Sequence, residues 1–170
     1  MSFADDIKKF AKKALDNAQK VVVETRYELS KRIIDRTPYD TIQPGDGGQA
    51  KANWNANTRS ADTSTTTRTD RDGNNTKAKA EYVSKSNIAD DYYLTNSLPY
   101  IAVLEYGGYP NPPKKGTHLT SKQSKDGKSG PGYYKFSQNG YSAKAPKGML
   151  RITVAEFDDI VLDIIRKKIK

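Results

Sequence analysis

Apolar residues recur at three- and four-residue steps along the first 36 positions, with lysines falling mostly between them. The recurring positions are Phe3, Ile7, Phe10, Ala14, Ala18, Val21, Leu29 and Ile33. This spacing is typical of an amphipathic helix. Ser2 and Asp5 fit a capping box at its start. Pro38 ends it, because proline disfavours helical geometry in the residue before it.

The length of this helix sets a geometric problem. A continuous helix from residue 3 to residue 36 would be ~50 Å long, whereas a compact domain of 170 residues has a radius of gyration of ~15 Å. We therefore expect the helix either to bend or to overhang the domain and be covered by a partner. A plain core helix with a frayed end is the alternative.

The middle of the chain alternates loops with short elements. Residues 42–51 are rich in turn-forming residues and predict a loop. Residues 52–58 alternate in polarity and predict a strand that Trp54 anchors against the first helix. Residues 59–75 contain almost no apolar side chains and predict a second exposed loop. Asn75 is a candidate cap for a short helix that runs to Val83.

The block from residue 91 to residue 108 is the longest apolar-rich stretch of the middle. Residues 91–96 predict a strand, and Asn96 suits the junction that follows it, since its side chain can substitute for backbone hydrogen-bond partners. Pro99 can begin a helical turn, and Gly107 with Gly108 would end it.

Residues 109–148 differ in character from the rest of the chain. They hold five prolines, six glycines, eight lysines and one acid, so they carry +7 of the net charge of +9. Loops longer than ~12–15 residues are uncommon in compact domains unless they are functional or disordered. We therefore expect a third long loop with a role in contacts to other molecules.

The end of the chain is again strongly amphipathic. Its apolar stripe predicts one helix over residues 149–169, with acids in its first part and Arg166, Lys167 and Lys168 near its end. That order of charges complements the helix dipole. Together these elements predict a single α+β domain over 1–170, a mostly antiparallel twisted sheet flanked by the two long helices, with long exposed loops at 42–51, 59–75 and 109–148.

Composition removes several classes of function. The chain has no cysteine, which excludes disulfides, thiol catalysis and cysteine-based metal sites. No run of ~18 apolar residues exists to cross a membrane. Acids occupy the place where an export signal has basic residues, so we expect a protein that is not exported.

Candidate catalytic residues are poorly supplied with partners, so we expect neither an enzyme nor a bound cofactor. His118 is the single histidine of the chain and has no second ligand at metal-binding spacing. Asp90 and Asp91 are adjacent, and on a strand they would point to opposite faces. Glu105 is a candidate buried acid, for which a structural role is favoured over that of a general base.

A nucleic-acid-binding module is the alternative function. The loop at 109–148 interleaves lysines with aromatic residues, a mixture that can neutralise phosphates and stack on bases. Against it, the charge is almost entirely lysine, and no recognised DNA- or RNA-reading motif is present.

Three separated groups of residues carry a resemblance to a known family. They are Arg-Thr-Pro-Tyr-Asp-Thr at 36–41 with Gln-Ala-Lys-Ala-Asn-Trp at 49–54, Leu-Thr-Asn at 94–96 with Pro-Tyr-Ile at 99–101 and Leu-Glu-Tyr-Gly at 104–107, and Ala-Pro-Lys-Gly-Met-Leu-Arg at 145–151. In order and spacing they resemble the neck and tail-completion proteins of tailed double-stranded DNA bacteriophages. One departure is that the family's glycine directly after Asp40 and Thr41 is absent, because Ile42, Gln43 and Pro44 precede Gly45.

The resemblance implies a structural subunit of the virion that forms rings, typically hexameric, in the phage neck or upper tail. Its partners would be further copies of itself, other neck, head-closure or tail-tube proteins, and packaged DNA through non-specific contacts. It would reside in the neck or tail of the virion, and in the host cytoplasm during assembly. We expect partner contacts at the tyrosines and lysines in and before the basic loop, namely Tyr100, Tyr106, Tyr109, Lys114, Lys115, Lys122, Lys125, Lys128, Tyr133 and Tyr134.

Overall fold

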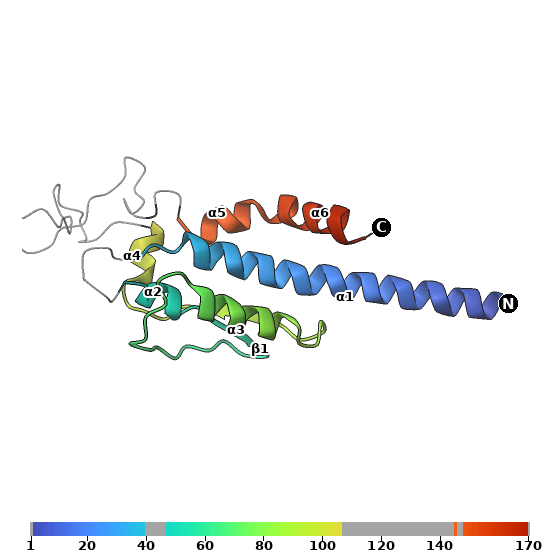
Figure 1. Cartoon of the computed structure of the whole chain (residues 1–170), viewed down its shortest axis with the longest axis horizontal. Coiled ribbons are helices and arrows are strands. Elements are labelled where there is room, and N and C mark those ends of the chain that lie inside the picture. The colour runs from blue at the N-terminus through green and yellow to red at the C-terminus, as the bar shows by residue number, and fades with distance from the viewer. Residues whose placement is uncertain (1, 40–46, 107–144, 146–147, 170) are drawn as a thin grey trace, which may run out of the picture.

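A single helix, α1, is the longest element and runs along most of the molecule (Figure 1). The computed structural model describes residues 2–39, 47–106, 145 and 148–169. Helix α1 spans Phe3–Arg36 and begins with the expected capping box, in which the Ser2 hydroxyl accepts from the Ala4 N–H and the Asp5 carboxylate accepts from the Ser2 N–H. The predicted first helix is therefore confirmed at both of its ends.

Helix α1 is straight, and its N-terminal part projects beyond all other elements (Figure 1). We call residues 3–18 the arm. Nearly every residue of the arm is exposed, whereas the four residues of α1 that are buried all come from its C-terminal part. Of the two expected geometries, the structure therefore has the overhang rather than the bend.

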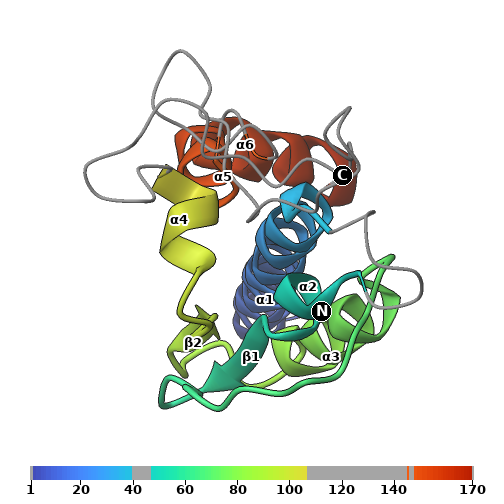
Figure 2. The same ribbon diagram turned by 90° about the vertical axis from the view of Figure 1, so that its left-hand side faces the viewer.

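The remaining elements pack on two sides of the C-terminal half of α1 (Figures 1 and 2). Helices α5 (Leu150–Ala155) and α6 (Phe157–Lys168) lie along one side. Helix α3 (Asn74–Ser84) lies along the other side together with the strands β1 (Asn55–Thr58) and β2 (Tyr92–Thr95). Helix α1 is thus the middle layer, and both halves of the core are built on it.

The C-terminal helix is not continuous, which corrects the prediction of one helix over 149–169. A turn at Glu156 separates α5 from α6. At this turn the Glu156 carboxylate accepts hydrogen bonds from Arg36 at 2.7 and 2.9 Å and from Arg32 at 2.9 Å. The break thus occurs where a carboxylate is held by two arginines of α1, a long-range pairing that helical periodicity cannot reveal.

The sheet is small. Among the described residues it consists of β1 and β2 alone, paired antiparallel with Asn55 opposite Thr95 and Thr58 opposite Tyr92. The broad α+β class and the antiparallel pairing are confirmed, but helices dominate the described residues, and the predicted twist of the sheet stays a prediction.

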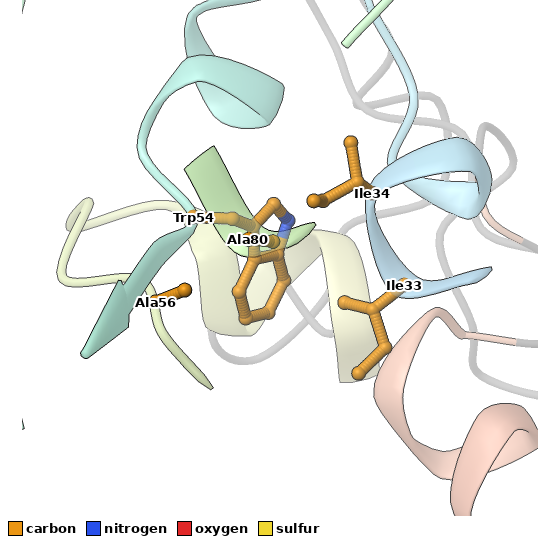
Figure 3. Packing of buried hydrophobic residues seen from close by; sticks show 5 residues of the cluster. All are labelled: Ile33, Ile34, Trp54, Ala56 and Ala80. Carbon is orange, nitrogen blue, oxygen red and sulfur yellow. The ribbon is translucent and has the colours of Figure 1, made fainter. Parts of the chain in front are cut away.

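Trp54 forms the centre of the apolar core, as expected. It packs with Ile33 and Ile34 of α1, Ala56 of β1 and Ala80 of α3 (Figure 3). Its indole N–H donates to the Thr37 hydroxyl at 2.7 Å. Burying an indole without a partner for its N–H is costly, so this bond lets Trp54 join the first strand to the end of α1.

The first two predicted loops are shorter than expected. Residues 49–51 belong to a helical turn, α2 (Gln49–Ala52), which corrects the end of the loop at 42–51. The second loop ends at Gly73, because α3 begins at Asn74. Asn75 does not cap α3: the start of this helix is held by Asp70, whose carboxylate accepts from the Thr76 N–H at 2.8 Å and the Thr76 hydroxyl at 2.7 Å.

The helical turn after Pro99 is present as α4 (Ile101–Tyr106). Asn96 occupies the junction before it as expected, since its amide donates to the Ala50 carbonyl and its carbonyl accepts from the Leu98 N–H. The turn at Asp40, the Gly107–Gly108 stop and nearly all of the loop at 109–148 lie outside the described residues.

Candidate assembly surface

The arm presents a stripe of large apolar side chains to solvent. Phe3 is 80% exposed and Phe10 is 75% exposed, and Ile7 and Leu15 are also exposed. Single exposed apolar residues are common on protein surfaces, but a contiguous row of them marks an interaction site. The exposed stripe of the arm is therefore typical of a helix that packs against another protein surface.

A second apolar surface is a groove of about 540 Å³ near the middle of the molecule. Its walls come from α1, β2, α5 and α6. The lining residues are Val21, Val22, Thr25, Arg26, Leu29, Ser30, Ile33, Tyr92, Leu94, Leu150, Thr153, Val154, Phe157 and Val161. Val154 is 62% exposed, and Leu150 and Phe157 are also exposed at its α5–α6 wall. The groove is open to solvent along this wall.

The arm stripe and the floor of the groove lie on one face of the same helix. Positions 3, 7 and 10 continue at three- and four-residue steps through Ala14 and Ala18 to Val21, Thr25 and Leu29. Residues at this spacing share a face of an α-helix. The two apolar surfaces are thus one continuous strip, free at the arm and walled at the groove.

A third feature joins α4 to α5 through Glu105. This side chain is buried, with the residue 5% exposed. Its carboxylate accepts from the N–H groups of Met149 at 2.7 Å, Leu150 at 2.9 Å and Arg151 at 3.0 Å, and from the Arg151 Nε at 3.2 Å. The Arg151 guanidinium also donates to the Glu105 carbonyl at 2.6 Å. Glu105 thereby caps the start of α5 from another part of the chain.

This environment keeps Glu105 ionised. Burial alone pushes the pKa of Glu105 up, but the N–H groups of Arg151, Met149 and Leu150 and the Arg151 side chain outweigh it, so the pKa lies below its ordinary value. An ionised carboxylate whose oxygens are already engaged in four hydrogen bonds is a poor general base. The contacts of Glu105 therefore fit the structural role that the sequence favoured, which is to cap the start of α5.

The Glu105 contacts also bring together the two ends of the basic segment. Tyr106 is the last described residue before it, and Gly148 precedes the start of α5. Gly148 has a φ of +73°, and a Cβ at this position would lie 2.6 Å from the Glu105 Oε1. Only glycine fits there without strain. The contacts of Glu105 thus hold the neighbourhoods of Tyr106 and Gly148 at one junction.

Two of the residues predicted to bind partners are described. Tyr106 is 56% exposed, and the Arg151 guanidinium lies 4.5 Å from the centre of its ring. Tyr100 is half-buried, and its hydroxyl donates to the Gln49 side chain at 3.3 Å. The other eight lie outside the described residues, namely Tyr109, Lys114, Lys115, Lys122, Lys125, Lys128, Tyr133 and Tyr134.

A cluster of lysines forms where the arm passes the end of α6. A shallow hollow of about 570 Å³ is lined by Lys9, Lys12, Lys13, Asp16, Asn17, Lys20, Lys167 and Lys168. Helical spacing predicts that lysines of α1 share a face, but only the packing of α6 against α1 adds Lys167 and Lys168. We call this group the lysine cluster.

The described residues hold no group of three or more side chains suited to a metal ion. Asp90 and Asp91 do not form a pair: the Asp90 carboxylate faces Arg59 at 3.6 Å, and the Asp91 carboxylate accepts from the Tyr93 hydroxyl at 3.4 Å. His118 lies outside the described part of the chain.

No helix within the described ranges is long and apolar enough to span a bilayer.

Sequence reasoning missed two organising arginines. Apart from the place of Arg151 in the 145–151 motif, nothing in the sequence indicates its contact with Glu105. Arg26 is buried and donates to the backbone carbonyls of Asn87, Ile88 and Asp90, which shapes the turn between α3 and β2. The one hint in the sequence is that the apolar positions given for the first helix pass from Val21 directly to Leu29.

Comparison of the chain with models of known protein families, with curated proteins and with solved structures found no match.

Proposed function

We propose that this protein is a structural virion subunit that forms rings in the neck or upper tail of a tailed bacteriophage, where it completes the tail and joins it to the head. The observation that carries the proposal is the pair of uncovered apolar surfaces, the arm and the groove. Proteins that act alone rarely leave large apolar side chains in contiguous rows on their surface. A subunit that functions only within an assembly has a reason to do so.

The motifs behind the family resemblance support the proposal through their structural roles. Trp54 anchors the core, Asn96 holds the junction before α4, and Glu105 caps α5 through a contact with Arg151. These three motif residues thus have a task in building the scaffold, as expected for motifs that specify a fold.

The described part of the chain supports a binding role better than a catalytic one. The buried acid is committed to hydrogen bonds, and the lysine cluster and the apolar strip offer contact rather than reaction. We propose accordingly that the ring subunit has no enzymatic activity and acts through ordered assembly with other copies and with adjacent neck or tail proteins.

The test is assembly onto tails. Purified protein is mixed with phage tails that lack their completion ring, and the products are imaged by negative staining and tested for joining to filled heads. The proposal expects an added ring at one end of the tail and a gain of head-joining. A protein that never binds tails or necks in this assay would refute it.

A basic nucleic-acid-binding module remains a second candidate, and the lysine cluster favours it. Six lysines from α1 and α6 gather around one hollow. If they contact a phosphate backbone, affinity for duplex DNA falls steeply with salt. Changing Lys9, Lys12 and Lys13 to Glu would then abolish DNA binding while tail binding persists. DNA affinity that this change leaves intact would contradict a role for the cluster.

A further inference from the structure

We infer that the groove is filled by the arm of a second copy of this chain, with the two α1 helices antiparallel and crossing at Ala18. The inference goes beyond the proposed ring, because it concerns how the free subunit covers its apolar strip. It rests on the spacing of residues along α1 and on the position of the groove.

The apolar strip has a symmetry about Ala18 that suits antiparallel pairing. In such a pair, residues equally far from Ala18 on opposite sides lie opposite each other. Phe3 then faces Ile33 of the second copy, Ile7 faces Leu29, and Leu15 faces Val21. The three facing residues of the second copy all line its groove.

The smaller residues of the arm follow the same rule. Ala11 falls opposite Thr25 of the second copy, and Ala14 falls opposite Val22, both of which also line the groove. The separation of packed helices depends on the side chains at their contact. With Ala11, Ala14 and Ala18 at the centre, the two helices can approach closely there and place the larger residues of each arm in the other copy's groove.

Charges on one edge of α1 are complementary in the same arrangement. Positions 6, 13, 24 and 31 are separated by seven, eleven and seven residues, which are close to whole numbers of helical turns, so they share one edge. Two antiparallel helices related by a two-fold axis bring equivalent edges together. Symmetry about Ala18 places Asp6 opposite position 30 and Lys13 opposite position 23 of the second copy. On the shared edge, Lys31 and Glu24 are each one residue from these positions, so both pairs bring opposite charges close together.

The area available fits a stable interface. Aromatic side chains bury ~150–250 Å² each, so the mostly exposed Phe3 and Phe10, with Ile7 and Leu15, give roughly 500 Å² per arm on this scale. Two arms and the two grooves that receive them would bury on the order of 2,000 Å² in total, which is within the range of specific protein interfaces. The exchange leaves neither copy with an uncovered arm. It is therefore a closed contact that does not propagate.

The first test is the mass of the purified full-length chain. We expect a dimer at micromolar concentration, and we expect Phe10→Asp to raise its dissociation constant by at least ~100-fold, because each dimer loses two buried rings and gains two charges. Tyr82→Asp is the matched control, since Tyr82 is 81% exposed on α3, away from the arm. A wild-type chain that stays monomeric to tens of micromolar would overturn the inference, as would a dimer that both variants leave intact.

The second test fixes the crossing point. The chain has no cysteine, so an Ala18→Cys variant has a single thiol. The two-fold arrangement places this thiol beside the equivalent thiol of the second chain. We expect rapid formation of a disulfide-linked dimer, with Tyr82→Cys as the slow control. An Ile7→Cys/Leu29→Cys variant should also cross-link between chains. If neither variant cross-links faster than the control, the antiparallel register is wrong.

These tests separate the inference from the proposed function. Both use the purified chain, whereas the proposed function is tested on tails. Cross-linking at position 18 in a protein that never binds tails would uphold the arm exchange and refute the ring. A chain that forms rings on tails but never dimerises in solution would uphold the proposed function and refute the arm exchange.

Discussion

Replacing Glu105 tests how strongly the fold depends on a cap supplied from a distant part of the chain. The carboxylate accepts four hydrogen bonds from the start of α5 and from Arg151. A hydrogen bond to a charged group contributes ~1.5–3 kcal/mol net to stability. Because the four bonds share one carboxylate, their contributions do not add up. Glu105→Gln keeps the shape but turns an amide N–H₂ toward N–H donors. We expect it to lower the free energy of unfolding by ~2–3 kcal/mol.

Glu105→Ala should cost more. It leaves the N–H groups at the start of α5 without an acceptor and removes the buried partner of Arg151, a change that typically costs ~3–5 kcal/mol. Because Arg151 is 39% exposed at its side chain and can be hydrated, we expect the lower part of that range. For a domain whose total stability is ~5–15 kcal/mol, this is a large fraction.

The assay is urea denaturation followed by circular dichroism, with equal slopes required for a valid comparison. Glu81→Gln is the matched control, because Glu81 pairs with Lys85 on the exposed face of α3, and we expect no measurable change there. If both Glu105 variants lost less than ~1 kcal/mol, the capping role assigned to this carboxylate would be wrong.

The same carboxylate predicts a dependence on pH. Its pKa is lower in the folded protein than its ordinary value, which is ~4.3 in an unfolded chain. Its stabilising contribution is therefore complete above ~pH 4.3 and is lost as the pH falls through the lower, folded-state pKa. The difference in unfolding free energy between wild type and Glu105→Gln should be constant near neutral pH and shrink in acid. A difference that grew on acidification would contradict this sign.

Three further substitutions probe the scaffold, each measured by urea denaturation. Trp54→Phe removes the buried hydrogen bond to Thr37 and should cost ~1–3 kcal/mol; an unchanged midpoint would mean that the bond contributes nothing. Asp70→Ala removes the acceptor for Thr76 at the start of α3 and should cost ~1–2 kcal/mol. Gly148→Ala places a Cβ at a positive φ and 2.6 Å from a carboxylate oxygen, and should cost at least ~1–3 kcal/mol from the backbone conformation alone.

The elements that sequence predicts well are those fixed by nearby residues. The capping box of α1 depends on Ser2 and Asp5, and the end of the helix depends on Pro38. The strands around residues 55–58 and 92–95 follow from local polarity patterns. Asn96 bonds a backbone N–H two residues on, which its residue type alone suggests.

The elements that sequence predicts poorly are fixed by contacts that helical periodicity does not show. The turn between α5 and α6 lies where Glu156 meets Arg32 and Arg36, more than a hundred residues away in the chain. The start of α3 depends on a shorter contact: the Asp70 carboxylate, outside the helix, accepts from the Thr76 N–H, so Asn75 does not cap the helix. The spacing of apolar residues carries no information about either contact.

The candidate surface shows the same division. The arm stripe can be predicted from the sequence of α1, whereas the length of the helix left a bend or an overhang open, and the structure shows the overhang. The groove cannot, because its walls come from α1, β2, α5 and α6, and only packing brings them together. The lysine cluster likewise needs Lys167 and Lys168 to meet the arm.

Two carboxylates join elements of the scaffold that are far apart in the chain. Glu156 ties α5 and α6 to α1, and Glu105 ties α4 to α5. The arm leaves this body at one end, and the Glu105 junction between α4 and α5 lies at the other (Figure 1). Because α1 is one straight helix joined to both, a partner that holds the arm also sets the position of the Glu105 junction. The proposed ring assembly would gain from this arrangement, since one contact would orient the whole subunit.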